Sequence, residues 1–444
     1  MRGAGPHRRH VLVGLAATAL APPPGSADAI IAAMIRRGEA REAALRRAFP
    51  FGRPDGGSPY VVGPRHGAWL DLAAPDAAAR LDAETERLRS AAAKGVVPPA
   101  FLLDQIIAAQ GKLQGPDALR RQRDALEALR PGARAAPGVW ALPGGRAYYA
   151  ARLACATGTD WTPEQLEARV GAAIRRLVLR AEGLLAGLGF PRGSVGARLR
   201  ALKTRPEHLY TDDDAGRARA VADMNAALDR LRPKLPGVFH PPIPPAAIRR
   251  MSPADERARR RGYRAPPFYF PDLASVRDRP RFTLVPVAYH ETLPGHLLQL
   301  PRQADRVPSP AQLRYAPGYA EGWAIYAESL ADRMGLLSPV EQVGFCQSQL
   351  FRLARVAADI GLHWHGWDRP RAMRFLEETV GFELFFPFAQ EVDRYAAEPA
   401  GFAGDAAVAL TLIELAAGRG DLRAFHDKVL NRGPLSAEAL REVA

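Results

Sequence analysis

The segment HETLPGH, residues 290–296, determines how the chain must fold around its most chemically distinctive side chains. In the zinc-binding pattern HExxH, two histidines four residues apart lie on one helix face, with the glutamate beside the bound water. Here the second histidine is six residues after the first, so a straight helix would turn it about 120° away. Pro294 removes a backbone donor and Gly295 tolerates unusual dihedrals. We therefore expect a kink or bulge that swings His296 back towards His290; the alternative is a helix end with two unrelated surface histidines.

The segment EGWAIYAE, residues 321–328, brings two carboxylates on the next expected helix. Glu321 and Glu328 are seven residues apart, so they share one helix face. Two imidazoles and Glu321 would leave a fourth metal position open to water, as in catalytic zinc sites. The alternative is an amphipathic helix with two solvated acids, which the apolar context with Gly, Trp and Tyr disfavours. Together the two segments predict one Zn²⁺ per chain, held by His290, His296 and Glu321.

Helical periodicity extends over most of the remaining sequence. Residues 162–165, TPEQ, form a capping box that opens a long helix reaching about residue 188. Residues 268–270, FYF, lie between prolines and are the best candidate for a strand, short and at an edge. The expected fold class is therefore mainly α, a large helical body with at most a short edge strand or small sheet.

A run of prolines between residues 233 and 245 is the only plausible domain boundary. Division there gives an N-terminal helical region, residues 30–235, and a catalytic helical region, residues 236–444, which contains the HExxPGH motif. The same proline-rich stretch would also serve as a crossing loop in one continuous body. Both interpretations stay open at this point.

Residues 1–29 have the composition of an export signal. Arg8 and Arg9 precede a short apolar run, which is followed by three prolines and the A-x-A sequence at 27–29. Paired arginines in this position fit a twin-arginine signal. An apolar run of roughly 11 residues is too short for a bilayer that needs ~20, which disfavours an anchor helix. We expect an exported, periplasmic protein, cleaved near Ala29 and without stable membrane insertion.

Composition excludes several classes of protein. The 444 residues are 47% hydrophobic and 24% charged, which is typical of a globular chain. The net charge of +14 comes from arginines spread along the sequence and interleaved with acids, so no nucleic-acid partner is expected. Cys155 and Cys346 exclude a disulfide scaffold and a thiolate zinc site; two free thiols are preferred, with one disulfide as the alternative. Nothing in the sequence indicates an oligomeric state.

Several segments together resemble a known bacterial family. HETLPGHLLQ and EGWAIYAE are similar to the family catalogued as domain of unknown function 885, which is grouped with the gluzincin zinc metallopeptidases. Four further segments agree in order: GGRAYY at 144–149, the helix start at 162–171, RVAADIGLH at 355–363 and EVDRY at 391–395. The resemblance covers about residues 90–400. It implies a mostly helical body with a zinc cleft, and hydrolysis of peptides as the activity.

The sequence departs from the family pattern at three places. Leu297 stands where the family usually has a second histidine, and residues 399–401, PAG, stand where it usually has Pro-Gly-Gln. The N-terminal region also looks short for the family. None of these departures affects metal ligation, but each bears on substrate binding.

The expected mechanism is peptide hydrolysis by a metal-activated water, with Glu291 as the general base. One alternative is a zinc hydrolase or lyase that acts on a non-peptide substrate. Another is a non-catalytic envelope binding protein, which the intact Glu291 disfavours because a binding scaffold has no use for a base there.

The reaction also needs a donor for the oxyanion, and further residues are candidates for substrate binding. Tyr395 is the chosen donor and His363 the other catalytic candidate. Arg394 and Tyr326 are assigned to substrate binding. The alternatives are purely structural roles: a buried histidine at 363, an ion pair between Arg394 and Glu391, and packing of Tyr326.

Two acids are expected to orient the metal ligands by hydrogen bonds without contacting the metal. Glu328 is one of them, and it becomes the third ligand if Glu321 is not. Asp359 is the other, as a partner for an imidazole or for Arg355, with a plain helical salt bridge as the alternative.

Overall fold

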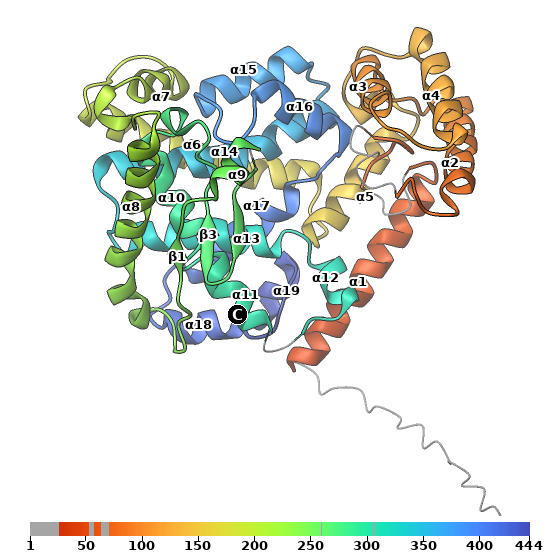
Figure 1. Ribbon diagram of the computed structural model, residues 1–444. Helices are drawn as coiled ribbons and strands as arrows, with labels where there is room; N and C mark the ends of the chain where they lie inside the picture. Colours follow the sequence, from red (N-terminus) through yellow and green to blue (C-terminus); the bar gives the residue numbers. More distant parts are fainter. Residues whose placement is uncertain (1–25, 53–56, 64–70, 259, 305–306) are drawn as a thin grey trace, which may run out of the picture.

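The computed structural model describes residues 26–52, 57–63, 71–258, 260–304 and 307–444 (Figure 1). Helices dominate these residues and enclose a single small sheet within them. This confirms the mainly α fold class. The expected export signal lies almost entirely outside the described residues.

The helices of the first half are α1 (Ala27–Ala48), α2 (Ala77–Ala93), α3 (Ala100–Gln110), α4 (Asp117–Leu129), α5 (Gly145–Thr157), α6 (Pro163–Gly187), α7 (Val195–Lys203) and α8 (Asp214–Leu231). Those of the second half are α9 (Pro253–Arg257), α10 (Arg281–Glu291), α11 (His296–Ala304), α12 (Pro310–Tyr315), α13 (Tyr319–Arg333), α14 (Pro339–His363), α15 (Arg369–Thr379), α16 (Phe388–Ala397), α17 (Ala403–Ala416), α18 (Leu422–Leu430) and α19 (Ala437–Val443). Short 3-10 turns lie at Arg130–Gly132, Val139–Ala141, Pro206–His208, Arg232–Gly237 and Val276–Asp278.

Capping chemistry sets the start of the two longest helices. Thr162 accepts from the backbone of Gln165, whose side chain accepts from the Thr162 backbone in return, as the capping box predicts. Ser338 and Glu341 form the same box at the start of α14. Helix α14 packs along α6 and also contacts α10, α13, α15, α16 and α17. Helix α14 is therefore the central helix, and both α10 and α13 pack against it.

The sheet has three strands in the order β1-β3-β2. Strand β3 (Phe268–Phe270) pairs in parallel with β1 (Ala247–Ile248) and antiparallel with β2 (Tyr263–Ala265). The strand expected at residues 268–270 is thus present, but it is the central strand and not an edge. Its neighbours are two and three residues long, too short to produce an alternating pattern in the sequence.

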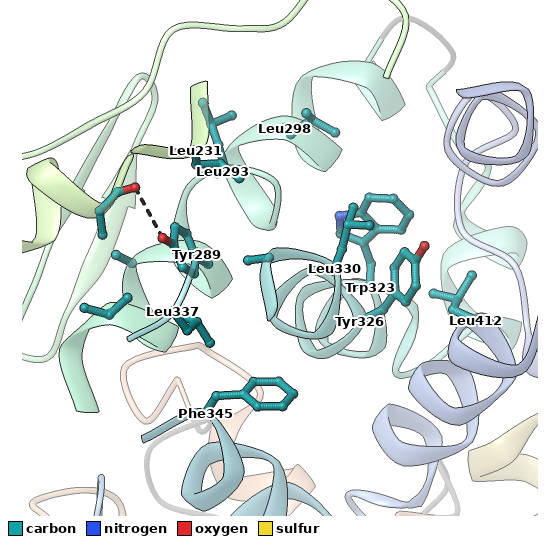
Figure 2. Close-up of a cluster of buried hydrophobic side chains, with 14 of the residues drawn as sticks. Leu231, Tyr289, Leu293, Leu298, Trp323, Tyr326, Leu330, Leu337, Phe345 and Leu412 are labelled. Atoms are coloured by element: carbon teal, nitrogen blue, oxygen red, sulfur yellow. Dashed lines mark hydrogen bonds between the residues drawn. The ribbon is translucent and has the colours of Figure 1, made fainter. Parts of the chain in front are cut away.

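One hydrophobic core contains residues from both sides of position 235. Ile30 and Met34 of α1 belong to the same buried cluster as Leu231, Trp323 and Leu440. Figure 2 shows part of it, with Tyr289 of α10, Leu293 of the connection between α10 and α11, Leu298 of α11, Leu231 of α8, and Trp323, Tyr326 and Leu330 of α13. The Tyr289 hydroxyl donates to the Ala227 carbonyl of α8 over 3.3 Å. Residues before and after the proline-rich stretch therefore contribute to one shared hydrophobic cluster.

The N-terminal limit of the fold differs from the expectation. Helix α1 begins at Ala27, where Ser26 caps it by accepting from the Ala29 backbone, and Ile30 is buried. The last residues of the expected signal therefore belong to α1, because a serine cap and a buried apolar face extend the helix to that point.

Two smaller expectations concern cysteines and membranes. Cys155 and Cys346 are both free thiols, the first half-buried and the second buried. No helix in the described part of the chain is long and apolar enough to cross a bilayer.

Candidate metal centre

The HETLPGH segment breaks the helix instead of bending it. Helix α10 ends at Glu291 and α11 begins at His296, with residues 292–295 forming a tight connection between them. Thr292 donates through its backbone and its hydroxyl to the Ala288 carbonyl, and the Gly295 backbone donates to the Tyr289 carbonyl. These bonds fold the connection back onto the end of α10. The expected approach of His296 to His290 occurs, but by two helices and not by a bulge within one.

Gly295 is required by the closeness of this turn. A Cβ atom there would lie 1.9 Å from the His290 carbonyl oxygen, so any other residue would push the two histidines apart. From the opposite side, the indole of Trp323 donates to the Pro294 carbonyl over 2.9 Å. Hydrogen bonds to α10 and to α13 thus fix the conformation of the connection.

Three side chains converge at this turn. The ligand atoms of His290, His296 and Glu321 all lie within 4.8 Å of one another. Glu321 Oε2 lies 3.3 Å from His290 Nε2, and Glu321 Oε1 lies 3.4 Å from His296 Nε2. The cluster therefore offers two imidazole nitrogens and one carboxylate, the donor set that zinc takes in open sites.

Helix α13 brings both of its glutamates to the same imidazole. Glu321 lies in the first turn and contacts Nε2 of His290, whereas Glu328 lies two turns later and contacts Nδ1 over 2.9 Å. Gly322 lets α13 approach α17, since a Cβ there would lie 2.5 Å from Val408. The shared helix face inferred from the seven-residue spacing is present.

The contact with Glu328 sets the tautomer of His290. Nδ1–H donates to Glu328, so Nε2 is the nitrogen directed at Glu321 and the one that a metal would take in place of a proton. Gln349 of α14 donates to the other oxygen of Glu328 over 3.1 Å and so holds that carboxylate in place. This support from behind is the arrangement that orients metal-binding histidines.

One buried nitrogen of the cluster lacks a hydrogen bond, which is what a site for a divalent cation would show without its ion. Nε2 of His296 is buried and makes no hydrogen bond to any described residue, although Glu321 Oε1 lies 3.4 Å away. A buried polar atom without a partner is costly in a folded protein, and a metal ion would satisfy it. The two histidines are almost fully buried, while 41% of the Glu321 side chain is exposed, so solvent and small molecules reach the cluster past Glu321.

The pKa shifts of the three groups follow from their mutual contacts. Burial and Arg352 lower the pKa of His290, but hydrogen bonds to its two glutamates outweigh both and raise it to about 9. Burial raises the pKa of Glu321, but its close contacts with the two histidines and the charge of Arg352 outweigh burial and hold that pKa well below its ordinary range. Burial lowers the pKa of His296. The chain alone thus keeps an ionised Glu321 beside a neutral His296, both able to ligate.

Two arginines at the cluster were not anticipated from the sequence. Arg352 of α14 lies 3.4 Å from Glu321 Oε2 and 3.4 Å from His290 Nε2. Arg264 of β2 forms a close ion pair with Glu291. Neither arginine lies in a motif around the histidines, and only the packing of α14 and the sheet against α10 brings them there.

Glu291 lies next to the cluster at the last residue of α10. Its side chain is 18% exposed, and its carboxylate is held by Arg264. The general base inferred from the motif is therefore adjacent to the first ligand and anchored from the sheet.

Tyr395 and His363 do not lie where catalytic groups must lie. Tyr395 is fully buried in a separate core cluster, and its hydroxyl donates to Glu391 over 3.0 Å. His363 is also fully buried; Nδ1 accepts from the Val139 backbone and Nε2 donates to the Tyr395 carbonyl. Burial lowers the pKa of His363 to about 4. Both side chains are closed off from substrate, which corrects their assignment to catalysis.

Asp359 supports this second cluster and not the metal ligands. It accepts from the Tyr149 hydroxyl over 2.6 Å and from the Ala400 backbone over 3.0 Å. Burial raises the pKa of Asp359 to about 7. Arg355, its other expected partner, lies 3.7 Å from Asp405 instead. The role of Asp359 is therefore to join α5, α14 and the 399–401 turn.

The two candidates for substrate binding also have structural partners. Arg394 forms an ion pair with Glu391 over 2.7 Å, which was the expected structural alternative to substrate binding. Tyr326 is fully buried and shares a hydrogen bond of 2.8 Å with His426 Nε2; in Figure 2 it packs beside Trp323. Because both side chains are bound to structural partners, the structure gives neither assignment support.

The fold and the site together define a mainly helical protein with a candidate centre of two histidines and one glutamate. The chain belongs to the family described as bacterial protein of unknown function (DUF885), whose model matches residues 115–443. No curated protein matches the chain. Leu297, one of the family departures, is buried in the main core.

Two solved structures have a similar fold. One is described as a "putative lipoprotein" from Colwellia psychrerythraea, with a TM-score of 0.74 and 23% identity, covering 94% of this chain and 91% of that chain. The other is described as a "putative lipoprotein of unknown function" from Shewanella oneidensis, with a TM-score of 0.66 and 15% identity, covering 94% and 87%. These likenesses extend over almost the whole chain and show a shared fold.

Proposed function

We propose that the protein is a zinc-dependent peptidase, in which His290, His296 and Glu321 hold the metal. The observation that carries the proposal is the cluster itself: three ligand atoms lie within 4.8 Å of one another, and one of them, Nε2 of His296, is buried without a hydrogen bond to the described residues. Bound zinc would lower the pKa of a water and polarise a carbonyl. This reading also agrees with the resemblance of the two motifs to gluzincin peptidases.

The residues of the chain divide the work of hydrolysis. Glu291 takes a proton from the attacking water as the water oxygen bonds to the carbonyl carbon. The π electrons of the carbonyl pass to its oxygen, which becomes negative. When the carbon–nitrogen bond breaks, Glu291 returns the proton to the amine. Arg264 holds Glu291 at the end of α10, and Glu328 holds the His290 ring.

The test combines metal analysis with turnover on a mixed peptide library. Purified protein should contain about one zinc per chain and lose activity with a chelator. Glu291→Gln should keep the metal and the fold but lower kcat by at least ~10³-fold, because it removes proton transfer and not ligation. Glu377→Gln makes the same change on an exposed face of α15 and serves as the control.

The outcomes separate the rival functions. Chelator-sensitive turnover of an ester or another non-peptide substrate, without peptide cleavage, would favour the alternative zinc hydrolase. Bound zinc without any turnover would favour the non-catalytic envelope protein. Glu291→Gln with wild-type kcat would exclude the water-activating role.

We also propose that the protein is exported to the periplasm. The arginine pair at residues 8 and 9 and the apolar run that follows support this, as do the lipoprotein descriptions of the two structural neighbours. Mass spectrometry of fractionated cells should find a processed chain that begins near residue 30, and replacing both arginines by lysine should block delivery. A full-length cytoplasmic chain would contradict the proposal.

A further inference from the structure

The proposed hydrolysis lacks a donor for the negative charge that develops on the carbonyl oxygen. Such donors are often the largest single contribution to acyl-transfer catalysis. Tyr395, His363 and Tyr326 are fully buried and already hydrogen-bonded. The donor must instead be a group beside the three ligands that is not committed to a structural partner.

Arg352 meets the geometric requirement. Its two terminal nitrogens lie 3.4 Å from Glu321 Oε2 and 3.4 Å from His290 Nε2, the ligand atoms themselves. The side chain reaches them from α14, and Phe385 packs over the guanidinium with its ring centroid 5.5 Å away. A substrate oxygen that approaches the same ligand atoms comes within reach of the Arg352 donors.

The partners of the neighbouring arginines distinguish Arg352 from them. Arg264 forms its ion pair with Glu291, the proposed base, and Arg355 pairs with Asp405. For Arg352, the one carboxylate partner among the described residues is Glu321, which the proposed metal also requires.

Burial makes this incomplete pairing significant. Arg352 is only 9% exposed, and a buried guanidinium needs an anion or several acceptors. A cation held by Glu321 would weaken the attraction between that carboxylate and Arg352, because both positive charges compete for it. The guanidinium would then present its donors to another anionic group at the cluster.

We propose that Arg352 is a catalytic residue that donates hydrogen bonds to the scissile carbonyl oxygen as it becomes negative. This inference rests on the proposed peptidase function. As the water oxygen bonds to carbon and its proton passes to Glu291, the carbonyl π pair becomes the oxyanion that Arg352 stabilises. The charge disappears again when the carbonyl reforms and the amine leaves with the proton.

The test compares turnover with zinc affinity in one variant. Arg352→Met should lower kcat by about 10²–10³-fold with a much smaller change in KM, because the donor acts on charge present only in the transition state. The same variant should bind zinc with equal or higher affinity, by roughly tenfold, since a competing positive charge has been removed. A competition titration with a zinc-sensitive dye measures this affinity without any turnover.

Arg281→Met is the matched control. Arg281 lies at the start of α10, is 40% exposed and pairs with Asp223, so its loss should change neither kcat nor zinc affinity. If Arg352→Met fails to fold, Arg352→Gln keeps a polar side chain and should still lose about 10²-fold in kcat.

The results that would overturn the inference are specific. Wild-type kcat in Arg352→Met or in a folded Arg352→Gln would exclude the role of Arg352 while leaving the peptidase proposal intact. Loss of zinc together with turnover would reduce Arg352 to a structural support of Glu321. Wild-type protein without chelator-sensitive turnover would overturn both proposals.

Discussion

Two groups of histidine and carboxylate side chains lie along α14, and they differ in how completely their polar atoms are paired. Near the middle of the helix, Arg352 contacts the candidate ligands Glu321 and His290, and Gln349 contacts Glu328, which supports the His290 ring. Near its end, Asp359 and His363 form a second group with Tyr149. Both groups contain residue types typical of catalysis, and both fall in segments that resemble the same family.

The second group is closed. Both ring nitrogens of His363 are hydrogen-bonded to backbone, and the carboxylate of Asp359 accepts from a hydroxyl and a backbone N–H. In the first group, Nε2 of His296 has no hydrogen bond, and the Glu321 side chain is 41% exposed. The contrast teaches that residue type and spacing identify polar clusters, whereas unmet bonding capacity and access to solvent identify the one able to bind a ligand.

The largest expected effect is the loss of zinc when Glu321, the solvent-exposed candidate ligand, is removed. Glu321→Ala should reduce zinc affinity by ~10³-fold or more, because it removes the carboxylate that shares the ion with both imidazoles. Glu328→Gln should weaken binding by about 10–100-fold only, since it acts through the His290 ring. Elemental analysis and competition titration measure both. Full zinc occupancy in Glu321→Ala would transfer the ligand role to another acid, with Glu328 the first candidate.

A matched pair of histidine variants tests the contrast directly. His363→Leu should lower the free energy of unfolding by about 3 kcal/mol, because it leaves a buried N–H and a buried carbonyl unpaired. His296→Leu, measured in chelator, should change it by no more than about 1 kcal/mol, because its Nε2 makes no hydrogen bond to lose. Denaturant unfolding and zinc analysis should give opposite patterns for the two. Equal destabilisation would contradict the distinction between open and closed groups.

The closed group should also show itself in the pH dependence of stability. Burial raises the pKa of Asp359 to about 7 in the folded protein, above about 3.9 in an unfolded chain. The folded state therefore holds more protons between these values, and the contribution of Asp359 to stability falls as pH rises towards 7. The penalty of Asp359→Asn should shrink by about 2–3 kcal/mol from pH 5 to pH 8. A penalty that stays constant over this range would show that the carboxylate is already ionised in the folded protein at pH 5.

The smallest expected effect concerns the turn that completes the closed group. Ala400 has a φ of +58° and donates its backbone N–H to Asp359, and this left-handed conformation favours glycine. Ala400→Gly should raise the free energy of unfolding by about 0.5–1 kcal/mol. Ala168→Gly, on the exposed face of α6, should instead lower it by about 1 kcal/mol. The same sign in both variants would argue against strain at position 400.

The conformation of Ala400 also explains one departure from the family pattern. The family usually has glycine at this position, and the backbone here adopts the conformation that glycine suits best. The departure therefore lies in the closed group and not at the candidate metal centre. Its consequence is expected in stability more than in catalysis.

The sequence by itself determined the features that depend on nearby residues. The capping box at Thr162, the departure from a straight helix at Pro294-Gly295 and the shared face of Glu321 and Glu328 all follow from local backbone geometry, although the departure is a break and not the expected kink or bulge. Such features act over a few residues, so periodicity and turn chemistry are enough to predict them. The pairing of the two motifs in one cluster was inferred from a known donor set, and the structure has the same three residues together.

Only the tertiary structure decided which polar groups keep unpaired atoms and contact solvent. Arg352 reaches His290 across 62 residues of sequence, and Tyr149 reaches Asp359 across 210. No local pattern encodes such contacts, because they depend on how whole helices pack against one another. The same packing closed Tyr395 and His363 into the core and left Nε2 of His296 without a partner. Burial and pairing are properties of the assembled body, so residue type alone could not separate a structural histidine from a ligand.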